Sequence, residues 1–446
     1  MNAIRILCAL AAAAMAFASV PQPARAAAAV GIPSLESADG ATIVRQPDDA
    51  VSLTGVTVVV RAGLDRQTLK QNGLAALVAQ TIVRTPVASG SSAAVPLEDA
   101  VAAHGGSIQF TIDPSDVRFY VESLSVDAPV VLNLFRTALA SPSFSAATIR
   151  DARTQLVEEI HRVQQIALQV GLDMLNAASS REANIGLPEL GTPASLAEFF
   201  GRDASAFYRA YYRRGGCIVS AAGRLDAPAS DALKAIPTAL PAGSTQPLSV
   251  EVPQLRGATH EIITHRDIAS PWLIAQYPAP QVNSRDFGPM LVLSAFVRRT
   301  LADIAQVPGV VTPTFASRSV GTVYAYDRAP ANLVMYVNGG LIGDPSRAFA
   351  TALSVVSVLA ATRLQGSIEE FKAQAAGDFA SNATTLEART WLAAVFARES
   401  SSADFINRTL TSIAATTAPD VQRVARSYLG NPTIALVLPR GTNVSN

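Results

Sequence analysis

The sequence has few cysteines, few histidines and no net charge. Cys8 and Cys217 are its two cysteines, and four histidines are spread over 446 residues. Lys and Arg together number 35, as do Asp and Glu, so the formal net charge at pH 7 is zero. A protein that binds nucleic acid neutralises phosphates with a clustered excess of basic side chains, and no such run occurs here. These absences argue against a nucleic-acid-binding protein.

The small number of cysteines also bears on where the protein folds. Residues 1–26, MNAIRILCALAAAAMAFASVPQPARA, combine Arg5, an apolar stretch and a small-residue ending, which is the pattern of a cleaved secretory signal peptide. The apolar stretch at 6–20 is shorter than the roughly 20 residues of a membrane-spanning helix. Cleavage removes Cys8 and leaves Cys217 without a partner for an intrachain disulfide. We therefore expect a periplasmic or secreted protein with no stable membrane anchor.

Apolar residues, in contrast, are abundant. They make up 49% of the chain and charged residues 16%, which is enough apolar surface for large packed cores. The clearest interruption is LDAPASDALKAIPTALPAGSTQPLSVEVPQ, residues 225–254, whose prolines and small residues are typical of a linker. The predicted organisation is an N-terminal domain at 27–225, a linker at 226–254 and a C-terminal domain at 255–446.

The ends of these two domains are alike. TPASLAEFFGRDASAFYRAYYRRGGCIVSAAG, residues 192–223, predicts an amphipathic helix, a glycine-containing break and a β-branched strand. TTAPDVQRVARSYLGNPTIALVLPRG, residues 416–441, repeats that order. The long period indicates a duplication rather than a solenoid of short repeats.

Strands and helices alternate in the first half. The patterns predict a strand at 56–60, helices at 73–83 and 97–104, a hairpin at 107–124 turned at 113–116, and helices at 128–141 and 145–171. Hairpin strands interspersed with helices favour an α+β fold. We expect two homologous halves, each a mostly antiparallel sheet with helices packed on one face.

Four ordered segments carry a family resemblance: NGLAALVAQTIVRT, LEDAVAAHGGSIQFTIDPSDVRFYVESL, RDARTQLVEEI and ELGTPASLAEFFGRDASAFYRAYYRRGGCIVSAAGRLD. Together they resemble the pitrilysin/insulinase-type zinc peptidases, nearest to the processing-peptidase branch. The resemblance covers about Val51–Asp226 and, more weakly, Thr259–Pro439. In that family the helix matching 73–83 carries His-x-x-Glu-His, in which two histidines bind zinc and the glutamate activates a metal-bound water.

The zinc motif is missing from this chain. The matching positions are Ala76, Ala79 and Gln80, and the third ligand position matches Glu159, with Glu158 as the alternative register. One carboxylate and one amide are too few strong donors for zinc, so the resemblance implies no catalytic residue and no bound metal. We expect Glu159 to lie instead on an exposed helix face, paired with Arg162 or with another helix. No histidine forms a pair with a glutamate at metal-binding spacing in a helix; the four are His104, His161, His260 and His265.

The resemblance also points to a substrate-holding pattern, Arg-x-x-x-Gly-x-x-Tyr, in the C-terminal half. Neither possible register keeps the arginine, and one of them keeps the tyrosine as Tyr324, with Arg318 next to the arginine position. Arg318 and Tyr324 are therefore the candidate substrate-binding residues, although Tyr324 and Tyr326 alternate in a strand and core packing explains at least one of them. The two registers place the pattern on Ala305, Gly309 and Thr312 or on Ser317, Gly321 and Tyr324.

These patterns predict an exported, non-catalytic subunit. It would pair with an active zinc subunit of the same fold and close a chamber in which peptides are degraded or processed. Zinc is expected only in that active partner, so the chain by itself is not expected to be an enzyme. The alternative is a stand-alone periplasmic clamshell that binds peptides or proteins without an enzymatic role.

Overall fold

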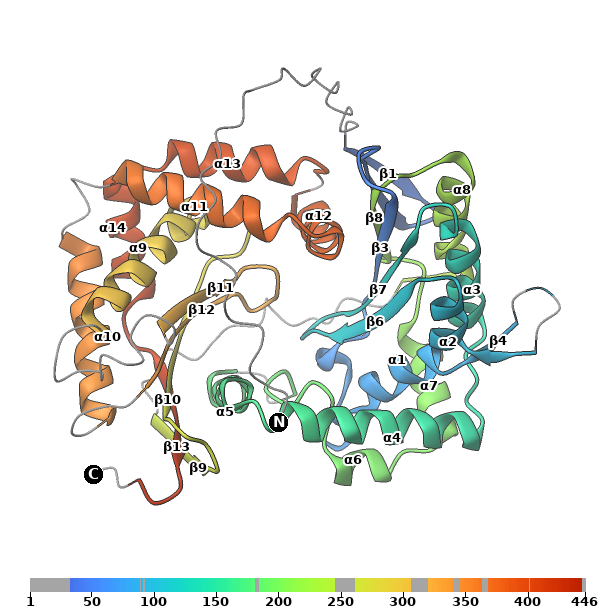
Figure 1. Ribbon diagram of the computed structural model, residues 1–446, viewed down its shortest axis with the longest axis horizontal. Coiled ribbons are helices and arrows are strands. Elements are labelled where there is room, and N and C mark those ends of the chain that lie inside the picture. The colour runs from blue at the N-terminus through green and yellow to red at the C-terminus, as the bar shows by residue number, and fades with distance from the viewer. Residues whose placement is uncertain are drawn as a thin grey trace, which may run out of the picture.

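The computed structural model of the chain describes residues 33–88, 90, 93–180, 184–244, 261–305, 320–339, 345–362, 368–400 and 402–442. The predicted signal peptide, residues 1–26, lies outside these ranges, and so do residues 245–254 of the predicted linker. Two sheets with their helices lie side by side (Figure 1). No helix within the described ranges is long and apolar enough to cross a membrane.

The first sheet has six strands in the order β1-β2-β8-β3-β7-β6. Neighbouring strands pair antiparallel except β2 and β8, which run parallel. The predicted strand at 56–60 lies within β3, and the predicted hairpin at 107–124 is β6 and β7. The strands are β1 Ser34–Ala38, β2 Ala41–Pro47, β3 Leu53–Val60, β6 Ser107–Ile112, β7 Val117–Leu124 and β8 Ile218–Gly223.

The second sheet repeats this topology with five strands in the order β11-β12-β10-β13-β9. Read from the other edge, β9-β13-β10-β12-β11 corresponds to β2-β8-β3-β7-β6, and its parallel pair, β9 with β13, has the equivalent position. The predicted α+β class with two homologous halves is confirmed. The strands are β9 Glu261–Arg266, β10 Trp272–Pro278, β11 Val320–Ala325, β12 Asn332–Asn338 and β13 Thr433–Pro439.

Helices flank both sheets. In the first half they are α1 Leu74–Val83, α2 Leu97–Ala103, α3 Ala128–Ala140, α4 Ala146–Val163, α5 Ala167–Ser179, α6 Pro193–Ala197, α7 Gly201–Tyr211 and α8 Ala227–Ala235. In the second half they are α9 Phe287–Ala305, α10 Pro345–Thr362, α11 Ile368–Asn382, α12 Leu386–Ser400, α13 Phe405–Ala415 and α14 Ala418–Tyr428. Short elements complete the first half: the 3₁₀ turns η1 Leu64–Arg66, η2 Leu69–Gln71 and η3 Pro237–Ala239, and the strands β4 Pro86–Val87 and β5 Val95–Pro96.

The predicted helix–break–strand units are present at the end of each half, as α7 with β8 and α14 with β13. Thr417 is the N-cap of α14: its hydroxyl accepts a hydrogen bond from the backbone N–H of Asp420, while the Asp420 carboxylate accepts from the N–H of Thr417. Thr192 makes the same reciprocal contact with Ser195 at the start of α6. In the first half this contact lies at α6, whereas at the start of α7 the Asp203 carboxylate accepts from the backbone N–H of Phe200.

One helix of each half packs on the sheet of the other half. α12 lies against β3 and β8 of the first sheet, and α5 lies against β13 and β10 of the second (Figure 1). The main core of the second half accordingly includes Val44, Val59 and Ile218 from the first. The sequence predicted helices on one face of each sheet, and the cover on the other face comes from the opposite half. This explains why the central strands β3 and β8 are buried on both faces.

Candidate functional site

The helix that matches the zinc motif, α1, is a packed core helix. Gly73, which immediately precedes α1, has a φ of 92°, a left-handed conformation that favours glycine, and a Cβ there would lie 3.0 Å from the Cα of Gly191. Ala76 and Ala79 are both 0% exposed, while Gln80 is half-buried. α1 packs against α4, α7 and β6. The two methyl groups are therefore packing residues at the positions where the motif has a ligand and a base.

Glu159, at the position that aligns with the third zinc ligand, is hydrogen-bonded to an arginine side chain. Glu159 on α4 is half-buried, and its carboxylate accepts hydrogen bonds from Arg162 Nε at 2.8 Å and Arg162 Nη2 at 2.5 Å. This confirms the predicted pairing with Arg162. Glu158, the alternative register, is exposed.

These residues do not fit a zinc ion. Zinc in proteins takes three or four strong donors from histidine, cysteine or carboxylate, and α1 offers two methyl groups and an amide. Among the described residues, no group of three or more His, Cys, Asp or Glu side chains is arranged to hold a metal ion. We derive no hydrolytic step at this helix.

The two candidate substrate-binding residues differ in what the structure says of them. Arg318 lies outside the described residues. Tyr324 on β11 is buried, its ring packs beside Phe287 and Tyr326 at centroid distances of 6.1 and 5.2 Å, and its hydroxyl donates to the carbonyl of Pro280. Burial holds the pKa of Tyr324 well above its ordinary value. Its position is that of a packing residue, and contact with a peptide stays a prediction.

The alternative register falls mostly where the structure gives no description. Ala305 is the last residue of α9, and Gly309 and Thr312 lie outside the described ranges. Arg298, farther up the same helix, donates to Asp378 at 2.6 Å. Neither register therefore gains a substrate contact from the described residues.

Strand β6 forms an edge of the first sheet and lies beside α1, the helix that lacks the zinc motif. Within the described residues it pairs with β7 alone, and α1 packs next to it. Ile108 and Phe110 pack against the first-half core, whereas Gln109 and Thr111 point to the opposite face. An edge strand presents a row of unpaired backbone N–H and C=O groups, which can pair with an added extended chain.

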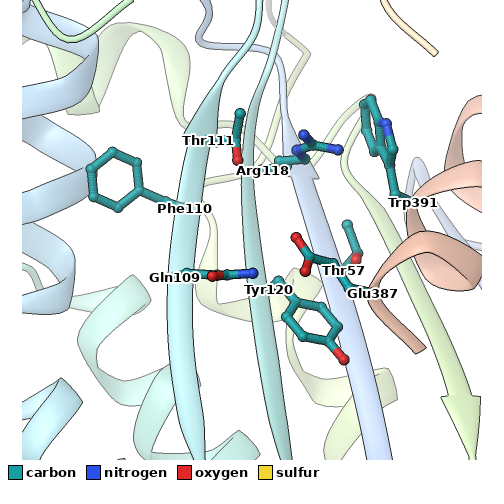
Figure 2. A pocket seen from close by; sticks show the side chains of 8 residues that line it. All are labelled: Thr57, Gln109, Phe110, Thr111, Arg118, Tyr120, Glu387 and Trp391. Carbon is teal, nitrogen blue, oxygen red and sulfur yellow. The ribbon is translucent and has the colours of Figure 1, made fainter. Parts of the chain in front are cut away.

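Beside this edge, polar side chains from both halves line a shallow depression, shown in Figure 2. Arg118 lies with its guanidinium carbon 4.3 Å from the centre of the Trp391 ring, and Tyr120 donates to Glu122. The lining comes from β3, β6, β7 and α12: Thr57, Gln109, Phe110, Thr111, Arg118, Tyr120, Glu387 and Trp391. The sequence did not predict this group of residues, although the alternating polar residues of β6 and β7 indicate one polar face of the sheet.

Comparison with known proteins finds a family similarity in the first half. Residues 42–193 match Insulinase (Peptidase family M16). Cytochrome b-c1 complex subunit 1, mitochondrial, of Caenorhabditis elegans is 23% identical over 185 residues, which are 42% of this chain and 38% of that protein. An uncharacterized zinc protease, YmxG, of Bacillus subtilis (strain 168) is 20% identical over 187 residues, 42% of this chain and 45% of that protein. The chain thus spans less than half the length of these curated relatives.

Solved structures extend the similarity to both halves. A protease from Helicobacter pylori superposes with a TM-score of 0.77 and 14% identity over 92% of this chain and 100% of its own. A peptidase M16 inactive domain from Pseudomonas fluorescens gives 0.76 and 13% over 93% and 99%. A chain of complex III2 from Candida albicans gives 0.73 and 14% over 91% and 95%. At these identities the likeness shows a common fold.

Proposed function

We propose that this chain is a non-catalytic subunit that pairs with an active zinc subunit of the same fold, since residues 42–193 match the insulinase-like peptidase M16 family and lack its zinc motif. The observation that carries the proposal is the packing of α1. Its scaffold is kept, while Ala76 and Ala79 stand buried where the motif needs a ligand and a base. A peptidase-like fold that is kept without the zinc motif is proposed to function through its binding surfaces.

The proposed contribution of this subunit is to hold peptides in an extended form. The β6 edge lies next to α1, so a peptide added to that edge would run past this helix. Main-chain hydrogen bonds would supply the affinity, and alternate side chains of the peptide would face the Gln109 side of the sheet. An active partner would supply the zinc and the hydrolysis.

The cross-packing of α5 and α12 favours this role over a stand-alone clamshell. A clamshell binds its ligand by opening and closing two halves, whereas here each half covers the sheet of the other. The Thr57 and Thr390 hydroxyls, 2.7 Å apart and buried, join the halves in the middle of that contact. The enclosing chamber is therefore proposed to form between two chains.

Binding at the β6 edge can be tested with N-methylated peptides. Two versions of one binding peptide carry methyl groups on alternate backbone nitrogens, one version on the odd and one on the even residues. Because an added strand directs alternate N–H groups to the sheet and to solvent, one version should lose binding and the other should keep it. If both versions lose binding equally, or if neither loses binding, the edge-strand proposal is wrong.

The subunit role is tested by reconstitution. The partner is expected to carry an intact His-x-x-Glu-His, to co-purify with this chain, and to hydrolyse peptides more slowly when this chain is omitted. The contact should bury well over about 1,200 Å² if the complex is stable. A partner that works equally well alone, together with recovery of this chain alone from the cell, would favour the stand-alone binder.

Export is a separate part of the proposal and rests on residues 1–26. The mature protein in the periplasm or medium should begin at Ala27, which N-terminal sequencing would show. A full-length chain retained in the cytoplasm would contradict it.

A further inference from the structure

The second sheet has an open edge at the place where the first sheet has an additional strand. In the first sheet, β1 pairs antiparallel with β2 along its outer edge. The equivalent strand of the second sheet, β9, pairs with β13 alone among the described residues (Figure 1). Four of its six side chains are exposed: Glu261, Ile263, His265 and Arg266. The internal repeat therefore indicates what this edge accepts, namely an antiparallel strand.

The backbone of β9 directs hydrogen-bonding groups to the open edge. The carbonyl of Arg266 accepts from the backbone N–H of Arg440, which follows β13, so the main-chain groups of Arg266 point into the sheet. Main-chain groups of successive residues in a strand point to opposite sides. Those of Glu261, Ile263 and His265 therefore point to the open edge, where an added antiparallel strand would pair with them.

The sequence of β9, EIITHR, is complementary to itself in the antiparallel direction. In two copies related by a twofold axis that passes through the sheet at Ile263, the two Ile263 side chains lie opposite each other. Glu261 of each copy then lies opposite His265 of the other. Ile263, which is 40% exposed, would be covered, and each carboxylate would lie beside an imidazole rather than beside another carboxylate.

The next possible register is less favourable. An axis at Thr264 places Glu261 opposite Asp267, so that two pairs of carboxylates face each other, and it separates the two Ile263 side chains. Like charges directly opposite each other destabilise a strand pair. The register through Ile263 is therefore the one that the side chains of β9 favour.

The occupied edge of the first sheet shows a contact of the same kind. Arg45 on β2 forms a salt bridge with Glu36 on β1, with Nη2 and Oε2 2.8 Å apart. Leu35 of β1 packs against a hydrophobic core. An apolar contact together with a cross-strand pair of opposite polarity thus already joins an added strand to this edge of the fold.

We propose that β9 pairs with β9 of a second copy of this chain, so that the second sheets of the two copies form one continuous sheet. The proposal goes beyond the pairing with a zinc subunit, because the β6 edge belongs to the first sheet and is not used. One strand pair is a small contact compared with the roughly 1,200 Å² of a stable complex, so the dimer should dissociate on dilution.

Cross-linking of the mature protein tests the register. Without residues 1–26 its one cysteine is Cys217, which is buried, so an introduced exposed cysteine is the reactive one. Ile263→Cys should form a covalent dimer with a short bis-maleimide, because the two positions face each other across the axis. Val323→Cys is the matched control and should stay monomeric, since Val323 is 51% exposed on β11 at the opposite edge of the same sheet.

Sedimentation over a roughly hundredfold range of protein concentration measures the dimer without a cross-linker. Ile263→Pro removes an N–H that points to the open edge, and proline is tolerated at such a position of an edge strand. This variant should stay monomeric at concentrations at which the wild type is dimeric. Ile263→Val keeps both the N–H and an apolar side chain, so it should still associate.

Charge variants cover the case in which Ile263→Pro does not fold. His265→Glu places two pairs of carboxylates opposite each other and should raise the dissociation constant about tenfold. Adding Glu261→Lys to His265→Glu should restore association at least to the wild-type level, because opposite charges then face each other in both pairs.

Several outcomes would overturn the proposal. They are a monomer at every concentration, association that survives both Ile263→Pro and His265→Glu, and cross-linking of Val323→Cys as efficient as that of Ile263→Cys. Species that grow beyond a dimer would also overturn it, since they would indicate pairing of β9 with β1 of the next copy. None of these results bears on the β6 edge, which the N-methylated peptides test separately.

Discussion

At the residue scale, two of the positions on α1 that align with the zinc motif are core packing positions. Ala76 and Ala79 do not leave vacant ligand positions, because both are fully covered by the core between α1, α4 and β6. Restoring the motif would place an imidazole and a carboxylate where methyl groups now pack. A protein interior is packed to nearly crystalline density, so such insertions force neighbours to move.

Ala79→Glu should therefore destabilise the protein rather than restore a base. Overpacking and burial of a carboxylate together should lower the free energy of unfolding by about 3 kcal/mol or more. Gln80→Glu, one residue along the same helix at a half-buried position, should cost less than about 1 kcal/mol. Urea unfolding of both variants checks this. An Ala79→Glu protein as stable as the wild type would show that the space beside α1 is open.

A second residue, Asp65 on η1, makes stability depend on pH. Burial raises the pKa of Asp65 to about 7, opposed by Arg66. Because this exceeds the ordinary value of about 3.9, the folded state binds the proton more tightly, and the stabilisation present at low pH is lost as pH rises through 7. The free energy of unfolding should therefore change between pH 5 and pH 7.5 by on the order of 2 kcal/mol less in Asp65→Asn than in the wild type. Urea midpoints of both proteins at the two pH values give the difference, and parallel changes in both would contradict it.

At the scale of elements, α12 is held on the first sheet by a directional contact as well as by packing. The Thr390 hydroxyl donates to the carbonyl of Leu386 at 2.8 Å and lies 2.7 Å from the Thr57 hydroxyl. With its own proton donated to Leu386, Thr390 accepts the proton of Thr57. The Thr57 hydroxyl therefore depends on Thr390 for its hydrogen-bond acceptor, whereas the Thr390 hydroxyl keeps Leu386 as a partner without Thr57.

That inequality gives a double-mutant prediction. Thr390→Val should cost about 1–3 kcal/mol, because it leaves the buried Thr57 donor unpaired, whereas Thr57→Val should cost less, because Thr390 keeps Leu386. The double variant should cost less than the sum of the two, with a coupling of about 1 kcal/mol. Additive costs in urea unfolding would show that the contact does not contribute.

The elements show how far the sequence alone could reach. The β-branched run of β3, the β6–β7 hairpin and the helix–strand ends of both halves follow from local patterns, whereas the positions of the missing zinc motif come from the family resemblance. α12 is buried around most of its surface, which its apolar residues indicate, but nothing local says that it covers the other half's sheet. The Arg118–Trp391 contact joins residues far apart in the chain, and the strand pattern of Tyr324 fits a core residue as well as a surface one. These features depend on long-range packing.

At the scale of the whole molecule, the exchange of helices makes the two halves one folding unit. Leu175 of α5 packs with Ile274, Val334 and Ala435 of the second sheet, and Ser179 Oγ donates to Gln276 at 2.6 Å. Without the other half, each sheet would expose a face that is now buried. Each half has its own main core, and α5 and α12 connect the two.

Expressing residues 27–244 and 261–446 as separate fragments tests this view and the predicted domain boundary together. Neither fragment should be stable alone, because each exposes a large apolar sheet face, but the two should co-purify when expressed together. Leu175→Glu in the first fragment should abolish co-purification, since it buries a charge against the second sheet. Ala177→Glu, at an exposed position of the same helix, should leave it unchanged. If each fragment folds alone and the pair does not associate, the halves are independent domains, and the case against a stand-alone clamshell loses its structural basis.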